Sequence, residues 1–165
     1  MKIGAGVEWC VHACTLLAVL PANRALNAEA LAEYFDVPPA YLAKQMQALS
    51  KAGLVISHRG SSGGYHLSRP AEEISLWDIT EAVEGAKPSF RCQEIRQGGP
   101  CGARPEECRR PCGVAASFYA AETAFRDHLR GVSLASIIVD AASSYASDRQ
   151  EDFAVWLEAN ASRLS

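Results

Sequence analysis

The stretch that most constrains the fold is residues 90–113, FRCQEIRQGGPCGARPEECRRPCG, which holds four of the six cysteines and three of the eight prolines. Proline removes a backbone donor, and glycine costs conformational entropy when it is ordered, so a regular helix or strand is excluded here. Something other than backbone hydrogen bonds must therefore fix this loop. Four thiols between two helical segments suggest either a bound metal or a pair of disulfides.

Whether the protein is in a reducing or an oxidising compartment helps to choose between a bound metal and a pair of disulfides. Residues 7–20 are apolar enough to raise the question of a secretory signal, but Glu8 and His12 interrupt the run and no convincing small-residue cleavage site follows. We therefore expect a folded helix in a cytoplasmic protein, with no membrane span. In a reducing compartment stable disulfides are disfavoured, so the loop thiols are expected to be ligated or reactive.

Composition is that of an ordinary globular protein, since 48% of the 165 residues are hydrophobic and 21% are charged. The net charge of −3 gives no overall attraction to nucleic acid or to an anionic membrane. No acid, however, lies between Asp36 and Glu72. The cations in that window are Lys44, Lys51, Arg59 and Arg69. A locally positive region is therefore expected within an acidic protein.

The first helix is predicted from apolar residues that recur at helical spacing between residues 7 and 18. Cys10 and Cys14 fall in this apolar stripe, where cysteine commonly acts as a small buried hydrophobe. Glu8 and His12 lie one turn apart on another face, so a carboxylate and an imidazole are presented together. On spacing alone, the simpler interpretation of that pair is a solvated contact on the helix surface.

The next segment predicts a helix-turn-helix. Asn27 can cap a short helix that ends at the Asp36–Pro39 breaker, and a second helix starts at Pro39 and stops at Gly53. One side of this second helix is apolar and the other is rich in hydrogen-bond donors, which is the layout of a DNA recognition helix.

Two short strands, near residues 54–57 and 65–67, follow this helix, and the RGSSGG sequence between them predicts the flexible tip of a wing. Arg59 lies at the base of the tip, where it could enter a minor groove or hold a phosphate. The predicted DNA contacts are Tyr41, Lys44, Gln45, Arg59, Ser61 and Gly63. A winged helix used only for protein contacts is the alternative.

A capping box is predicted at Ser75 and Asp78, opening a helix that ends at Pro88. Beyond Cys112, apolar residues alternate three and four apart in a narrow seam, which predicts a long helix paired with its own copy in a two-fold dimer. The seam consists of Val114, Phe118, Ala121, Phe125 and Leu129. A last helix is expected near the C-terminus, with Phe153, Trp156 and Leu157 as its apolar contacts.

Four features together carry a family resemblance: YLAKQMQALSKAGLV, RGSSGGYHLSRP followed by EEISLWDITEAVEG, the cysteine loop, and a long helix that ends in a Ser-Leu element at Ser133-Leu134. Residues 1–140 thus resemble the winged-helix iron–sulfur transcription regulators of bacteria of the IscR and NsrR type, most closely the RsrR type. The resemblance implies a homodimer, not an enzyme, that binds double-stranded DNA at a palindromic operator. It also implies a [2Fe–2S] cluster whose redox state, reaction with nitric oxide or loss switches operator binding.

The resemblance implies metal ligands from both subunits: Cys92 and Cys112 of one chain, with Glu8 and His12 of the other. Trp9 adjoins Glu8 and projects from a neighbouring face, so we expect it to act as a switch residue that repacks when the ligand sphere changes, although core packing is the simpler role for a tryptophan there.

This chain departs from the family pattern because its loop has four cysteines, which leaves the roles of Cys101 and Cys108 open. Structural zinc held by four thiolates is therefore an alternative, and it would make a winged-helix regulator that is insensitive to electrons. An iron–sulfur electron-transfer protein is the less supported alternative, because no C-x-x-C or substrate-cofactor motif accompanies the loop.

The expected fold is mainly α with a small β wing, a winged helix-turn-helix domain plus a long dimerisation helix. We expect four parts: a DNA-binding domain at 1–88, a cysteine-rich cluster-binding loop at 89–113, a dimerisation helix region at 114–140 and a C-terminal helical extension at 141–165.

Overall fold

The computed structural model describes residues 3–60, 63–144 and 147–164. The helices are α1 (Ala5–Ala18), α2 (Ala28–Tyr34), α3 (Pro39–Lys51), α4 (Leu76–Glu84), α5 (Gly113–Arg130), α6 (Leu134–Ser144) and α7 (Ser147–Asn160). The strands are β1 (Arg24–Ala25), β2 (Val55–His58), β3 (Gly64–Leu67) and β4 (Ser162–Arg163), and three short 3-10 turns are η1 (Ala71–Glu73), η2 (Ile95–Gln97) and η3 (Pro105–Cys108). Among these described residues, no helix is both long and apolar enough to cross a bilayer.

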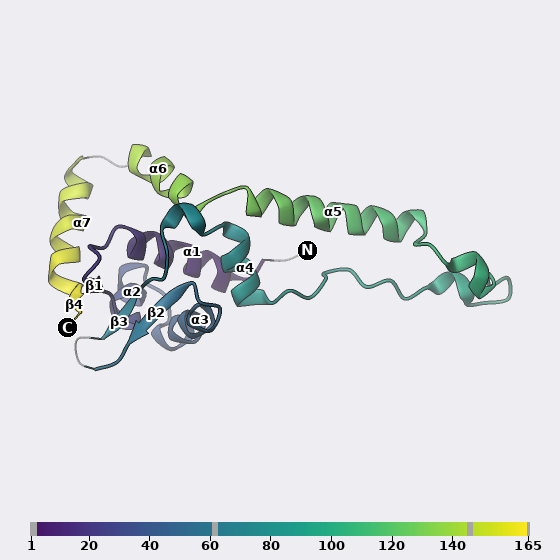
Figure 1. Ribbon diagram of the computed structural model, residues 1–165, viewed down its shortest axis with the longest axis horizontal. Coiled ribbons are helices and arrows are strands. Elements are labelled where there is room, and N and C mark those ends of the chain that lie inside the picture. The colour runs from purple at the N-terminus through teal and green to yellow at the C-terminus, as the bar shows by residue number, and fades with distance from the viewer. Residues whose placement is uncertain (1–2, 61–62, 145–146, 165) are drawn as a thin grey trace.

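The core of the body forms around α1, which packs against α3, α4, α6 and β3 (Figure 1). Cys10 and Cys14 on its apolar stripe are fully buried, as the spacing predicts, and Ala13 is buried with them. Burial raises the pKa of Cys10 to about 12 and also raises the pKa of Cys14, so both thiols stay protonated. These two cysteines are therefore core residues rather than metal ligands.

Local sequence signals set the ends of the next helices. The Asn27 side chain accepts a hydrogen bond of 2.7 Å from the backbone N–H of Ala30 and caps α2. Pro39 occupies the first turn of α3, and Gly53 just beyond its end has φ of 72°, the left-handed conformation that glycine adopts freely. Before α4, Ser75 and Asp78 form the predicted capping box. These short-range predictions are confirmed.

The wing is the antiparallel hairpin of β2 and β3, with Val55 opposite Leu67 and His58 opposite Gly64. Its base is anchored where Leu26 bridges to Tyr65. Together with α2 and α3 this hairpin completes the predicted winged helix-turn-helix.

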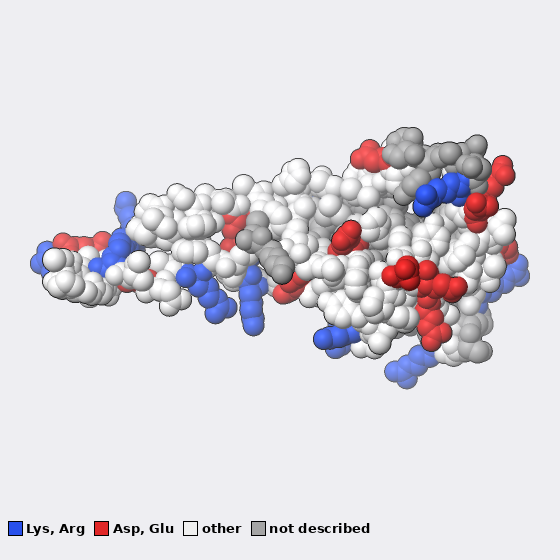
Figure 2. Space-filling model, turned by 180° about the vertical axis from the view of Figure 1, so that it is seen from behind, with Lys and Arg blue, Asp and Glu red and all other residues white. Residues whose placement is uncertain are grey.

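An arm leaves the body where α4 ends. It consists of residues 86–112 running outward, with η2 and η3 at the tip, and of α5 running back toward the body (Figure 1). The two limbs are joined partly by Phe90, whose ring stacks on that of Phe118 with centroids 4.7 Å apart. Between its charged tip and the body, the upper side of the arm is largely uncharged in Figure 2, whereas Lys and Arg side chains project from its lower side.

The long helix α5 ends at Arg130, just before the Ser133-Leu134 element, and α6 begins at Leu134 and packs back on α1. The C-terminal helix α7 then lies against α2, with the Trp156 and Phe153 rings 4.6 and 5.9 Å from the Tyr34 ring. After α7, β4 pairs with β1. The predicted apolar contacts of the last helix therefore cover the body.

Candidate functional site

The recognition helix α3 is held to the body by Leu42, Met46 and Leu49, which are fully buried. Its outer face exposes Lys44 and Tyr41, the latter with 46% of its surface accessible. Gln45 is only 8% exposed, and a Cβ at Gly6 of α1 would lie 3.3 Å from its amide. The prediction that Gln45 faces a groove edge is therefore wrong for this structure.

Gln47 was not predicted as a DNA contact, but it is the glutamine of α3 that faces outward. It is exposed, three residues after Lys44, and lines a groove between α3 and the wing. Asn27, Ala43, Ser57, Arg59 and Gly60 line the same groove. The spacing from Lys44 could have identified it, because residues three apart lie on nearly the same side of a helix.

The wing presents Arg59, which is exposed just after β2. Ser61 lies outside the described residues. Gly63 is buried, and a Cβ there would lie 2.3 Å from the carbonyl oxygen of His58. A Cβ at Gly64 would likewise meet the Leu26 backbone at 2.7 Å. Gly63 therefore closes a turn that admits no side chain, and its backbone lines the same groove between α3 and the wing.

The predicted Glu8 and His12 pair lies on the exposed side of α1, one turn apart. The His12 ring lies 5.4 Å from the Phe35 ring of the α2 C-terminus. Between them on the same helix, Trp9 is half-buried and meets the Tyr41 ring edge-to-face, with centroids 5.2 Å apart. The helix that carries the pair is thus in direct contact with the recognition helix.

Two of the loop cysteines have sulfurs that accept backbone hydrogen bonds. Cys92 Sγ accepts from the N–H of Glu94 at 3.4 Å, and Cys112 Sγ caps α5 by accepting from Ala115 at 3.5 Å. Both side chains are half-buried, as is Cys108, whereas Cys101 is exposed. Backbone donors aimed at sulfur suit thiolate ligands of a metal centre, because they stabilise negative charge on sulfur.

Arg96 was not singled out in the sequence, yet it organises this loop. Its guanidinium donates to both carboxylate oxygens of Glu94, at 2.5 and 2.7 Å, and to the carbonyl of Arg110 at 2.9 Å. Glu94 adopts a left-handed conformation with φ of 49°, and the Arg96 hydrogen bond lowers its pKa. The hydrogen bond to Glu94 raises the pKa of Arg96, and the nearby Cys108 and Cys112 raise it further. The arginine therefore ties the outgoing limb to the returning one beside two thiols.

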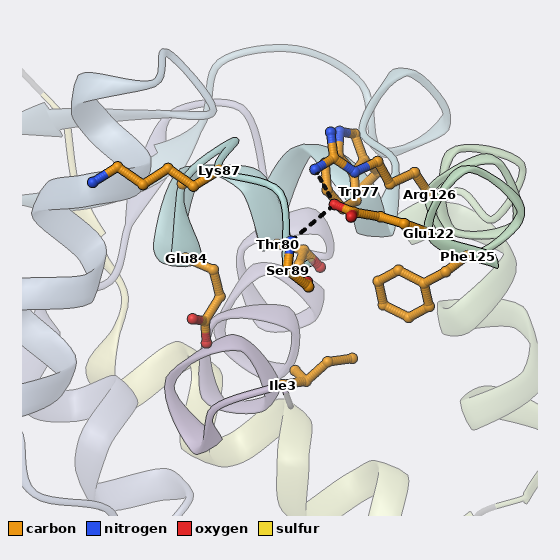
Figure 3. Close-up of a pocket in the computed structure, with 10 residues that line it drawn as sticks. Ile3, Trp77, Thr80, Glu84, Lys87, Ser89, Glu122, Phe125 and Arg126 are labelled. Atoms are coloured by element: carbon orange, nitrogen blue, oxygen red, sulfur yellow. Dashed lines mark hydrogen bonds and ion pairs between the residues drawn. The ribbon is translucent and has the colours of Figure 1, made fainter. Parts of the chain in front are cut away.

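The joint between arm and body is a small cavity of 120 Å³ beside α4 and α5 (Figure 3). Glu122 and Arg126 form an ion pair there, and Glu122 also accepts from the N–H of Ser89 at 3.2 Å. The Arg126 guanidinium lies over the Trp77 ring of α4, 4.9 Å from its centroid. The start of the cysteine loop is thus attached to α5 at the point where both meet the body.

The four predicted ligands do not form one site within a single chain. Among the described residues, no group of three or more His, Cys, Asp and Glu side chains converges as a metal site would require. The chain instead carries two partial donor sets, a carboxylate and imidazole on α1 and the thiols of the arm.

The chain is similar in sequence to known transcription regulators. The family model described as "Rrf2: Iron-dependent Transcriptional regulator" matches residues 3–140. The putative HTH-type transcriptional regulator YffB of Lactococcus lactis is 32% identical over 145 residues, which cover 88% of this chain and 92% of that protein.

Two solved structures share the fold. IscR of T. potens superposes with a TM-score of 0.64 at 22% identity, covering 89% of this chain and 93% of that one. The oxidised form of CymR from Staphylococcus aureus gives a TM-score of 0.62 at 26% identity, covering 89% and 99%. Both matches bear out the winged-helix architecture, with its mainly helical fold and small wing.

Proposed function

Because the chain belongs to the Rrf2 family of transcription regulators, we propose that it is a dimeric DNA-binding switch of the bacterial cytoplasm that holds a [2Fe–2S] cluster between its two subunits. Members of this family are regulators that bind DNA and are commonly dimeric, not enzymes.

The observation that carries the proposal is the division of the donors into two incomplete sets. Glu8 and His12 lie exposed on α1, and the half-buried Cys92 and Cys112 accept N–H bonds on the arm. Such sets become complete if the arm of one subunit reaches α1 of the other. Two thiolates, a carboxylate and a neutral imidazole fit a [2Fe–2S] cluster, and replacing thiolate by imidazole raises the reduction potential. A cluster bound there would supply a reversible one-electron change.

The coupling to DNA runs through α1. Trp9 is adjacent to Glu8 and contacts Tyr41 of the recognition helix. Any change that turns or shifts α1 therefore acts on Tyr41 directly, which supports Trp9 as the switch residue. Full switching of operator occupancy requires the two states to differ in DNA affinity by about 5.5 kcal/mol.

For the DNA interface we propose Tyr41 and Gln47 as contacts to base edges, and Lys44 and Arg59 as contacts to phosphates or the minor groove. Two copies of α3 in a two-fold dimer would read a palindromic operator.

The experiment begins with anaerobic purification and a visible absorption spectrum, followed by operator affinity measured with oxidised and reduced protein. The proposal expects iron, sulfide, a brown colour and different affinities of the two states. Equal affinities would contradict redox sensing, and a colourless protein containing zinc would favour the structural-zinc regulator. A His12→Ala variant with an unchanged spectrum and potential would remove His12 from the ligand set.

A further inference from the structure

Two histidines of the wing lie together on its outer face. His66 pairs with Ile56 across the hairpin, and His58 is two residues further along β2, so both side chains project from the same side of the sheet. His58 is exposed and His66 is half-buried. The opposite face carries Val55 and Leu67, which face the core. His58 is thus accessible, and His66 lies at the edge of a pocket that it lines with Leu20 and Arg69.

The two imidazoles face each other through their Nε2 atoms, which are 3.0 Å apart, and their rings stack with centroids at 5.0 Å. His66 Nδ1 lies 2.9 Å from the carbonyl oxygen of Leu67. A carbonyl can only accept, so this Nδ1 carries the proton and the Nε2 of neutral His66 has a free lone pair. In the metal-free protein His58 fills that lone pair by donating its own Nε2–H.

This arrangement matches the requirements of a metal-binding histidine pair. A backbone carbonyl that fixes one ring through Nδ1–H is the usual outer support of a histidine that ligates through Nε2. If His58 moves its proton from Nε2 to Nδ1, both Nε2 lone pairs become available and no net proton is released.

We propose that His58 and His66 bind one divalent transition-metal ion of tetragonal preference, nickel or copper, on the outer face of the wing, with water as the remaining ligands. At metal–nitrogen distances of about 2.0–2.1 Å, a nitrogen separation of 3.0 Å gives an angle at the metal close to a right angle. Square-planar and tetragonal ions take that angle, whereas tetrahedral zinc prefers a wider one.

The chemistry of the surrounding sequence agrees with this choice. Residues 37–71 contain no Asp or Glu, so the hairpin itself offers no carboxylate of the kind that magnesium or calcium requires. The ion would lie next to Arg59 and would add positive charge to the DNA-facing end of the wing.

The test uses isothermal titration of the full-length protein with Ni²⁺ in wild type, His58→Gln, His66→Gln and the control His128→Gln, which changes an exposed histidine on α5. The cysteine loop can also bind Ni²⁺, so the informative quantity is the difference between the proteins. We expect each wing variant to lose one binding event or to weaken it at least tenfold, since loss of an outer-shell partner alone costs about 10–100-fold. His128→Gln should match wild type.

With two imidazoles and water completing a six-coordinate tetragonal shell, Ni²⁺ is high-spin, so paramagnetic broadening gives a second readout that does not depend on the loop. Amide signals of residues 56–58 and 64–67 should broaden in wild type and stay sharp in both wing variants. Circular dichroism of the variants checks that the exposed substitutions leave the fold intact. Equal Ni²⁺ stoichiometry and affinity in all four proteins, or broadening confined to the cysteine loop, would overturn the proposal.

Discussion

At the residue scale, Arg96 is the side chain that gives the cysteine loop its shape. It is bound at both carboxylate oxygens of Glu94 and at the Arg110 carbonyl, so it bridges segments more than ten residues apart. It also places a permanent positive charge beside Cys108 and Cys112. A loop rich in glycine and proline has few backbone hydrogen bonds of its own, and this one arginine replaces several of them.

Two substitutions of Arg96 distinguish the effect of its positive charge from the effect of its planar hydrogen-bonding geometry. Arg96→Gln removes both, so we expect the reduction potential of the anaerobically purified protein to fall by on the order of tens of millivolts. The loop of the metal-free protein should also be cleaved faster by proteases that do not cut at arginine, such as chymotrypsin or thermolysin. Arg96→Lys keeps the charge but loses the planar fork, so it should restore the potential and leave the loop susceptible. An unchanged potential in Arg96→Gln would contradict the electrostatic role.

Glu122 gives the joint a dependence on pH. Desolvation raises its pKa, but hydrogen bonds from Ser89 and Arg126 outweigh this and leave the pKa below the usual range. A lowered folded-state pKa contributes stability above the unfolded pKa of glutamate, and that stability is lost as pH falls through the folded value. We therefore expect the thermal midpoint of wild type to drop more steeply below about pH 4.3 than that of Glu122→Gln. Glu72→Gln, at an exposed site, is the control and should follow wild type.

At the element scale, the important contact is the one between α1 and α3. Gly6 lets the two helices approach, since a Cβ there would lie 3.3 Å from both the Gln45 amide and the Tyr41 hydroxyl. Trp9 continues the contact one turn later. The helix with the candidate metal ligands and the helix that reads DNA therefore cannot move independently.

Gly6→Ala should alter DNA binding without replacing any proposed metal ligand or DNA contact, because its added methyl group would press on Gln45 and Tyr41 of α3. The added methyl group must push the two helices apart by a few tenths of an ångström, and overpacking of this kind costs about 1–3 kcal/mol. We expect operator affinity to fall roughly tenfold in fluorescence anisotropy at fixed salt. Gly131→Ala, at the C-terminal cap of α5 with φ of −76°, is the matched control. Equal affinity of both variants would show that the α1–α3 distance does not set the position of the recognition helix.

At the scale of the whole molecule, the arm is incomplete in a single chain. Val114 and Phe118 on α5 are 64% and 52% exposed, and the predicted seam continues along the same side of the helix. Figure 1 shows the outgoing limb of the loop running beside α5, and α4 packs against the body end of this helix. An apolar side of this length is what a second copy would cover in the proposed dimer.

A charge in the seam should therefore produce monomers. Ala121 is exposed in the seam, so Ala121→Arg leaves the single chain folded but places a buried charge in the proposed interface. We expect the mass measured by light scattering to halve, and binding to a palindromic operator to fall to that of one half-site. Ala120→Arg changes an exposed residue away from the seam and should remain dimeric. A dimeric Ala121→Arg would place the interface elsewhere.

The sequence by itself determined the features that depend on neighbours within a few residues. Asn27, Ser75 with Asp78, Pro39 and Gly53 set helix ends through local hydrogen bonds and backbone angles, and helical spacing was enough to bury Cys10 and Cys14.

Only the tertiary structure decided what depends on segments meeting across the chain. Gln45 lies inward because Gly6 lets α1 approach, Arg96 reaches Arg110 because the loop folds back, and His58 meets His66 because the hairpin register joins them. Helical spacing fixes the direction of a side chain only relative to its own helix axis, and the packing of a second element then decides whether that direction is solvent, core or partner.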